Sequence, residues 1–453
     1  MFEKEIKEKV NEITPQVVTW RRHFHTYPEI SGEEKETSLY IQEELKKLGI
    51  SFETGFFGTA VLGTIKGEQP GKTVALRADM DALPVTEQTG LPFASKNKGK
   101  MHACGHDSHM AILLGAAAVL NQMKSQLKGT VKLVFQPAEE EAAIGGGRHI
   151  AASGKLDDVS EIYGLHVWPE LPVGVIGLKP GNLMAASDRF YVHVKGKSTH
   201  AAQPHNGTDA LVAAAHFIID VQSLISREMN PMENVVCTIG LMNAGTRYNV
   251  GVEDAYLEGT VRTYTPALRD KMEARLGEIL KGLDVMFGTH SELNYVRGHS
   301  ATINTPEKIQ FLQEIGKTYV GEEHLTQPQY PSMCAEDFSS YLEKFPGAFL
   351  WLGTGKPGTP ALHNASFAID ESILQQTVFP CVGHDAAEEA AAHNPKFCLH
   401  IRNSFFWCRN AHVTESIVSY LAPKSYSSVC SPPSGRSRSL PETVASPESV
   451  IQR

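Results

Sequence analysis

The order of strand-like and helix-like segments is the feature that most limits how this chain can fold. Up to about residue 180, short apolar runs typical of strands lie at residues 73–78, 130–135 and 161–167. Residues 33–48, before the first of these strands, and residues 110–123, between the first two, carry apolar side chains in the pattern of helices. Strands that alternate with helices predict a mostly parallel sheet with helices on both faces, which is an α/β fold.

The pattern changes between about residues 183 and 302. There the segments follow the order strand, helix, strand, strand, helix, strand, at residues 188–194, 209–227, 235–242, 255–264, 266–287 and 291–297. This order is that of a ferredoxin-like α+β unit. Helix and strand patterns then return at residues 306–320 and 348–352. We therefore predict an inserted domain, residues 183–302, between two parts of a catalytic-type α/β domain, residues 1–182 and 303–376.

The C-terminal segment, residues 377–453, differs in composition from the rest. It holds four of the seven cysteines, and its last 29 residues include nine serines and four prolines. A helix that starts at residues 370–376 is predicted to stop before Pro380, because proline has no N–H to donate and its ring clashes with the preceding turn. Such a segment buries too little apolar surface to offset the entropy of ordering, so we predict a disordered tail.

The overall composition is that of a soluble globular protein, with 42% hydrophobic and 21% charged residues among 453. The net charge of −9 argues against nucleic acid or an anionic membrane as the main partner. Seven cysteines without a CxxC pair favour a reducing compartment. The N-terminal segment is charged and amphipathic, and the longest apolar runs are too short to span a membrane. We expect a cytoplasmic protein.

Side chains that can bind a metal follow the ends of four predicted strands. They are Asp79 and Asp81, the glutamates at 139–141, His166 and His363. A further group precedes the apolar helix, in the loop that contains His102, Cys104, His106 and His109. Open α/β sheets bind ligands outside the carboxyl ends of their strands. The sequence therefore predicts a crevice that gathers thiolate, imidazole and carboxylate groups.

This mixture of nitrogen, oxygen and sulfur ligands suits zinc, manganese, cobalt or nickel. Cys104 and His106 before the helix, a separate glutamate and two further histidines make five such ligands. Five exceed the four of a closed structural zinc site, so two metal ions with an activated water between them explain the set better. Neighbouring glutamates can face different ways, so that one binds metal while the other handles the proton of the water. A single histidine or cysteine would more often be an ordinary core residue, and the prediction depends on the combination.

Seven short motifs together resemble the metal-dependent amidohydrolases, the family of aminoacylases, hippurate hydrolases and auxin-conjugate hydrolases in the carboxypeptidase-like superfamily. In chain order they are MHACGHDSHMA, FQPAEE, GLHVWPELPVG, STHAAQPHNGTDA, EGTVRTY, AEDFSSYL and LHNASFAIDE. The similarity extends from about Val18 to Gln376. It implies a catalytic α/β domain with two metal ions and an inserted lid domain that often mediates dimerisation, here a homodimer.

The resemblance also implies roles for individual residues. The implied metal ligands are Cys104, His106, Glu140, His166 and His363. Glu139 takes the place of the general base, and Asp81 that of an acid that orients a ligand. His200 matches a histidine that steadies the oxyanion of the tetrahedral intermediate, and Asn249 and Arg262 match positions suited to a substrate carboxylate. Whether Cys104 or His106 is shared between the metals stays open.

The leading hypothesis is hydrolysis of an N-acyl amino acid, most favourably N-acetyl, by a metal-activated water. Deacetylation of N-acetyldiaminopimelate or N-acetylcysteine is one form of it. A dipeptidase or carboxypeptidase of the same superfamily is the alternative, which the Cys104-Gly-His106 loop disfavours because the peptidase branches more often have a carboxylate there. A binding or scaffold protein without catalysis is the second alternative, and the complete ligand set argues against it.

Overall fold

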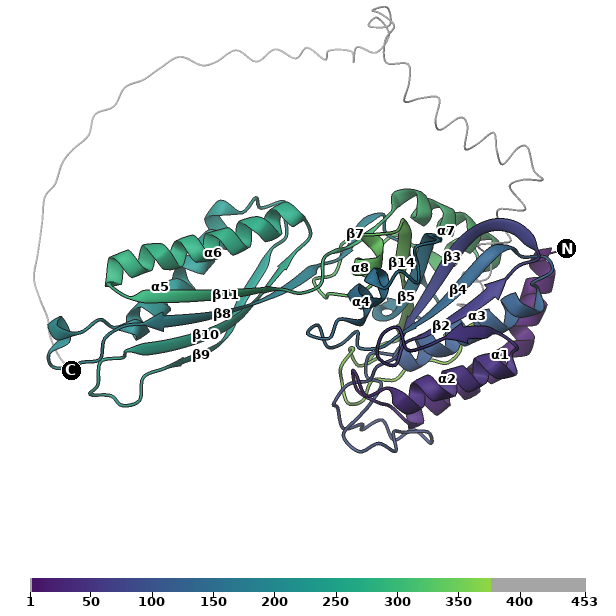
Figure 1. The fold of residues 1–453 in the computed structure, drawn as a ribbon, viewed down its shortest axis with the longest axis horizontal. Helices are drawn as coiled ribbons and strands as arrows, with labels where there is room; N and C mark the ends of the chain where they lie inside the picture. Colours follow the sequence, from purple (N-terminus) through teal and green to yellow (C-terminus); the bar gives the residue numbers. More distant parts are fainter. Residues whose placement is uncertain (1, 376–453) are drawn as a thin grey trace, which may run out of the picture. The chain divides into compact units, whose positions relative to one another are not determined.

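The computed structural model describes residues 2–375, so the predicted tail lies outside the described residues. Its largest sheet has eight strands in the order β1-β2-β4-β3-β5-β14-β6-β13. Figure 1 labels five of them, β2, β4, β3, β5 and β14. The four central strands are parallel, as predicted: β4 (Lys128–Gln136), β3 (Gln69–Asp79), β5 (Val159–Pro172) and β14 (Gly347–Gly355). Parallel strands place their carboxyl ends at one edge of the sheet, where the metal-binding side chains are predicted.

The outer strands of this sheet were not predicted, because they are short or only partly apolar. They are β1 (Ser51–Glu53), β2 (Val61–Lys66), β6 (Ile176–Gly177) and β13 (Leu325–Thr326). Strand β2 is antiparallel to both β1 and β4, and β6 is antiparallel to β14. Two further strands, β7 (Gly181–Met184) and β12 (Thr302–Asn304), pair with each other in a small separate sheet.

Apolar side chains on both faces of the large sheet build two cores. In β3, Val74 and Leu76 belong to one core and Ala75 to the other, as the alternation of a strand requires. The first core is covered by α1 (Phe2–Thr26), α2 (Lys35–Lys47), α3 (His106–Gln122) and α7 (Pro306–Tyr319). The second core is covered by α4 (Gly146–Ala152) and α8 (Ser339–Leu342). Helices thus lie on both faces, which confirms the predicted α/β fold.

Helix α3 is buried along most of its length, since every residue from His106 to Leu120 is inaccessible to solvent. Its alanines let it pack closely between α1 and the sheet. The loop before it turns at Gly105, whose φ of +91° is left-handed. A Cβ at this position would lie 2.3 Å from Val167 Cγ2, so only glycine fits between Cys104 and His106.

The inserted segment forms its own four-stranded antiparallel sheet. Its elements are β8 (Ala186–Lys195), α5 (Ala210–Ser223), β9 (Val236–Ala244), β10 (Asp254–Thr263), α6 (Pro266–Phe287) and β11 (His290–Arg297). The strand order β11-β8-β10-β9 is that of a ferredoxin-like unit, and α5 and α6 share one core with the sheet (Figure 1). This confirms an inserted α+β domain, while its predicted limits at residues 183 and 302 stay a prediction.

Helix α5 is shorter than predicted and continues as a single π-helical segment, Leu224–Glu228. Short 3-10 turns lie at Pro204–Asn206 and Glu322–His324. Among the described residues, one segment, Ala210–Glu228, is long and apolar enough to cross a membrane if only length and composition are considered. The same property is common in core helices, and 33% of its most apolar window is buried in the domain.

Candidate metal centre

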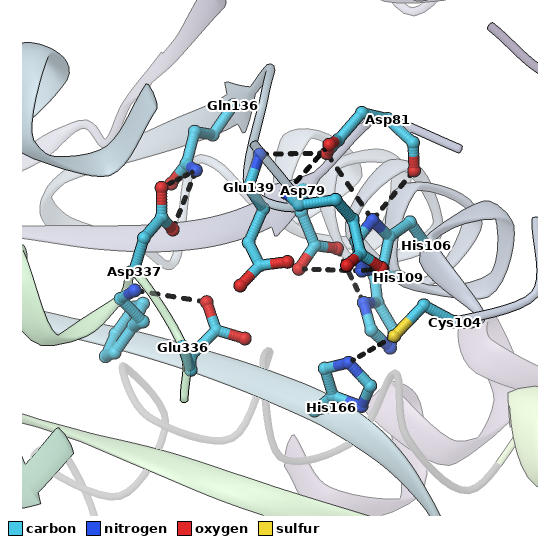
Figure 2. A network of polar contacts seen from close by, with 12 residues as sticks. Asp79, Asp81, Cys104, His106, His109, Gln136, Glu139, His166, Glu336 and Asp337 are labelled. Carbon is cyan, nitrogen blue, oxygen red and sulfur yellow. Dashed lines mark hydrogen bonds and ion pairs between the residues drawn. The ribbon is translucent and has the colours of Figure 1, made fainter. Parts of the chain in front are cut away.

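The carboxyl ends of the parallel strands bring together the side chains that the sequence singled out. Asp79 ends β3, the glutamates at 139 and 140 follow β4, and His166 lies in β5. Cys104 and His106 come from the loop and first residue of α3. Figure 2 shows Cys104, His106 and His166 directed toward one another in this cluster.

The first group of possible ligands consists of Cys104, His106 and His166, whose ligand atoms all lie within 4.8 Å of one another. Cys104 Sγ is 3.3 Å from His166 Nε2. The Nδ1 atoms of His166 and His106 lie 2.7 Å from Val167 O and 2.8 Å from Asp81 O, respectively. Because a carbonyl only accepts, each Nδ1 carries a hydrogen, which leaves Nε2 as the ring nitrogen that a metal ion could bind.

The second group consists of Cys104, Glu140 and His363, again within 4.8 Å. Glu140 Oε1 is 3.3 Å from His363 Nε2, and the His363 side chain is 53% exposed. The backbone of His363 is left-handed, with φ +64°, and its N–H donates to Ala103 O at 2.8 Å. Cys104 is the residue that the two groups have in common.

Two buried atoms of these groups make no hydrogen bond within the described chain: His106 Nε2 and Glu140 Oε1. An unsatisfied buried polar atom costs about 1–3 kcal/mol, so such atoms call for a partner. Burial, followed by the charges of Glu140 and Glu139, raises the pKa of the Cys104 thiol well above its usual range. A raised pKa favours the neutral thiol, whereas a bound cation lowers the pKa and favours the thiolate. The donor set therefore fits metal ions.

The carboxylate of Asp81 contacts a residue of each ligand group, His106 of the first and Glu140 of the second. Its Oδ1 accepts the Glu139 N–H at 3.0 Å, and its Oδ2 accepts the Glu140 N–H at 2.9 Å and the Ser31 hydroxyl at 2.6 Å. Although burial opposes ionisation, the hydrogen bond and the charge of His106, followed by the hydrogen bond from Ser31, lower the pKa of Asp81. Asp81 is thus an ionised carboxylate that orients the backbone of the two glutamates.

Glu139 is 8% exposed, and its carboxylate lies within 4.8 Å of those of Glu336 and Asp337 (Figure 2). Burial, followed by the charges of Glu336 and Glu140, raises the pKa of Glu139 well above its usual range. Among the described residues, its side chain is also close to His106 and Glu140. A carboxylate with a raised pKa beside possible metal ligands is suited to accept a proton from water.

A buried network around Arg77 was missed by the sequence analysis. The guanidinium donates to Asp79 at 2.7 Å, to Gln136 at 2.9 Å and to Asp337 at 2.7 Å, and it lies 3.0 Å from Glu336. Glu336 and Asp337 belong to the AEDFSSYL motif, which gave the only sequence signal for them. Arg77 sits within a strand that reads as apolar, and its partners are up to 260 residues away in the chain.

Replacing Arg77 with methionine is expected to lower the free energy of unfolding by about 3–5 kcal/mol, because it leaves buried carboxylates without their cation. Urea unfolding followed by circular dichroism measures this change. Arg297→Met is the control, since Arg297 pairs with Asp270 and Glu273 on the surface and should contribute less than about 1 kcal/mol. Equal losses in both variants would contradict the prediction.

Two other histidines of the loop do not belong to either group. His109 Nε2 accepts the Val167 N–H at 3.0 Å, so its Nδ1 carries the hydrogen and donates to Asp79 at 2.6 Å. Both nitrogens of His109 are thereby used. His102 is fully buried, burial lowers its pKa to about 3, and its ring nitrogens have no hydrogen-bond partner in the described chain.

Of the three residues predicted on the inserted domain, His200 and Asn249 lie near each other, and Arg262 lies in strand β10. His200 pairs with Val250 in an isolated bridge, next to Asn249, and its Nδ1 accepts the Ala202 N–H at 3.0 Å. Arg262 lies in β10 and donates to Thr260 and Val261 O. Within residues 2–375, no hydrogen bond or ion pair connects these side chains to the two ligand groups, so their roles stay predictions.

Comparisons with known proteins show the family to which the chain belongs. The sequence profile of peptidase family M20/M25/M40 matches residues 75–379. An N-acetyl-L-cysteine deacetylase of Bacillus subtilis is 40% identical over 374 residues, 82% of this chain and 88% of the relative. An N-acyl-L-amino acid amidohydrolase of Geobacillus stearothermophilus is 38% identical over 307 residues, 68% of this chain and 83% of the relative.

Among solved structures, the YxeP protein of Bacillus subtilis, described as a dinuclear metal-binding peptidase, matches with a TM-score of 0.74 and 36% identity. The match covers 83% of this chain and 99% of that one. The fold and these similarities define a hydrolytic enzyme of the metallopeptidase type. The chain belongs to peptidase family M20/M25/M40, which confirms the resemblance noted from the sequence.

Proposed function

We propose that the protein hydrolyses the amide bond of N-acyl amino acids, with N-acetyl amino acids as the favoured substrates. The names of the two bacterial relatives, a deacetylase and an amidohydrolase, support this reaction. The observation that carries the proposal is the pair of ligand groups that share Cys104, with Glu139 beside them. Such a site combines metal ligands and a proton acceptor, which amide hydrolysis by water requires.

The proposed cofactors are two divalent transition-metal ions, either manganese, zinc, cobalt or nickel. The residues that would hold them are Cys104, His106, Glu140, His166 and His363, of which Cys104 belongs to both ligand groups. The description of YxeP as dinuclear supports the number. Bound metal ions would lower the pKa of water and polarise the amide carbonyl.

The remaining steps depend on side chains of this chain. Glu139 takes the proton of the attacking water and delivers it to the leaving amine, a transfer for which its buried position and raised pKa suit it. Asp81 holds the backbone of Glu139 and Glu140 and the ring of His106 in place. It thereby fixes the direction from which the carboxylate of Glu139 reaches the water.

Three residues of the inserted domain complete the proposal. His200 would donate a hydrogen bond to the oxyanion of the tetrahedral intermediate. Arg262 and Asn249 would bind the carboxylate of the substrate, for which the forked guanidinium of arginine is well shaped. The side-chain oxygen of Asn249 is buried without a partner in the described chain; because this oxygen only accepts, it is the amide N–H of Asn249 that would donate to the substrate carboxylate.

We also propose a homodimer that forms through the inserted domain, and a cytoplasmic location. Helix α5 exposes the apolar side chains Leu211, Val212 and Ile219, which a second copy would cover. The three cysteines in the described chain are free thiols, as expected in a reducing compartment. The acidic net charge does not favour nucleic acid as a partner.

The test is an assay of the purified protein after removal of metal by a chelator and reloading with manganese, zinc, cobalt or nickel. We expect release of free amino acid from N-acetyl amino acids by the reloaded protein, none by the stripped protein, and slower cleavage of dipeptides. Faster cleavage of dipeptides would favour the peptidase alternative. No metal uptake and no turnover with any of the four metals would contradict the proposal and favour a scaffold protein.

A further inference from the structure

The corner that follows strand β4 has an unusual backbone. Ala138, the residue before Glu139, has φ +56°, and His363 is the only other non-glycine residue of the described chain with a positive φ. The left-handed conformation is unfavourable for a residue with a Cβ. Ala138 is fully buried and keeps this conformation next to the proposed general base, so the surrounding contacts must hold it there.

The side chain of Glu34 makes one of these contacts. Its Oε1 accepts the Ala138 N–H at 2.9 Å, across 104 residues of sequence. The same oxygen accepts the Gly32 N–H at 2.9 Å, and Oε2 accepts the Thr59 hydroxyl at 2.9 Å. Glu34 immediately precedes helix α2 but does not cap it with its side chain. Its carboxylate is 0% exposed and is used for the corner instead.

Glu34 and Asp81 together bind three successive backbone N–H groups. Glu34 takes that of Ala138, and Asp81 takes those of Glu139 and Glu140. Two buried carboxylates from distant parts of the chain therefore fix the peptide planes of this corner. Since Cα–Cβ directions follow from the backbone, they also fix where the side chains of Glu139 and Glu140 point.

We propose that Glu34 is a positioning residue, which acts through the Ala138 N–H to hold Glu139 and Glu140 in place. The inference rests on the proposed function, because it assigns the general base and a metal ligand to these two positions. In this role Glu34 supplies an acceptor oxygen on a side chain long enough to reach the Ala138 N–H, and its negative charge is not required. Its effect therefore depends on side-chain length and on one oxygen.

Two substitutions of Glu34 test the length of its side chain and its negative charge separately. Glu34→Gln keeps an acceptor oxygen at the same distance without the charge, and should keep kcat within about threefold of the original. Glu34→Asp keeps the charge but is one methylene too short to reach Ala138, and should lower kcat by about 10–100-fold, as losses of supporting bonds at metal sites do. Thr59→Val is the matched control, because Thr59 donates to Oε2 of the same carboxylate, whereas the Ala138 N–H donates to Oε1.

A second experiment tests the conformation directly. Ala138→Gly, combined with Glu34→Asp, should recover most of the lost kcat, since glycine adopts a positive φ without cost. A role of Glu34 in overall stability alone predicts no recovery, and predicts equal losses in Thr59→Val and Glu34→Asp. Thermal unfolding of every variant shows which of them are folded at the assay temperature.

Zinc affinity, measured by competition with a chromogenic chelator, gives a readout that does not depend on turnover. Because Glu140 lies on the same corner, Glu34→Asp should weaken zinc binding about tenfold or more, and Ala138→Gly should restore it. If the original protein hydrolyses no N-acyl amino acid but shows these zinc effects, the proposed function fails and the role of Glu34 stands. Unchanged kcat and zinc affinity in folded Glu34→Asp would overturn the inference.

Discussion

Replacing Glu139 with glutamine is expected to abolish turnover while both metal ions stay bound. A general base contributes about 10²–10⁴-fold to a rate, and glutamine cannot accept the proton of the attacking water. The change keeps the size and shape of the side chain, and the Glu139 N–H still donates to Asp81. kcat with an N-acetyl amino acid and metal content by mass spectrometry check the two parts of this prediction.

The third glutamate of the run, Glu141, gives a matched control. Glu141 follows in the same run, but its side chain bonds the Ala143 N–H at the surface. Glu141→Gln should therefore leave kcat within about twofold of the original, if Glu139 alone handles the proton. Retained turnover in Glu139→Gln would remove Glu139 from the mechanism, and loss of metal would show that it acts as a ligand instead.

The positions of the proposed metal ligands followed from the sequence because of one topological rule. Strands predicted at residues 73–78, 130–135 and 161–167 are parallel neighbours in the sheet, so the residues at their carboxyl ends meet. This rule places Asp79 and Glu140 at one edge without any knowledge of their contacts. Strand β5 runs on to Pro172, past its predicted end at residue 167, and His166 lies at the same edge because it follows Gly164, the last residue of β5 that pairs with β3. Apolar runs bounded by polar residues were strong enough signals to identify the central strands.

The residues that support the site could not be found in this way. Glu34 and Ser31 lie in a segment before helix α2 with no strand pattern, and their partners are Ala138 and Asp81. Arg77 is a single charged residue inside the apolar run at residues 74–78, a stretch of β3 that is buried throughout. Such contacts join positions distant in the sequence, and only the folded chain shows which acceptor meets which donor. The same holds for the tautomer of His109, which depends on the N–H of Val167.

The choice between Cys104 and His106 as the shared ligand also stayed open in the sequence, since both lie in the same loop. Spacing alone cannot decide it, because the two residues are separated only by Gly105. In the structure, Cys104 Sγ belongs both to the group with His106 and His166 and to the group with Glu140 and His363. This arrangement leads to a prediction about metal content that is specific to Cys104.

Replacing Cys104 with alanine is expected to reduce bound metal from two ions per chain to fewer than one, because it removes a ligand from both groups. His166→Ala and His363→Ala each remove a ligand from one group and should leave about one ion bound. Loss of a supporting or bound ligand typically weakens affinity by at least 10–100-fold. Metal content is measured by mass spectrometry after gel filtration at a fixed, buffered concentration of free zinc.

Cys237→Ala is the control for removing a thiol, because Cys237 lies on β9 of the inserted domain, outside both groups. It should keep two ions. Circular dichroism of the metal-free proteins separates loss of a ligand from loss of fold, and a buried cysteine replaced by alanine leaves only a small cavity. Two ions retained by Cys104→Ala would mean that the metals do not share this sulfur. One ion retained would assign Cys104 to a single metal and leave His106 or Glu140 as the shared ligand.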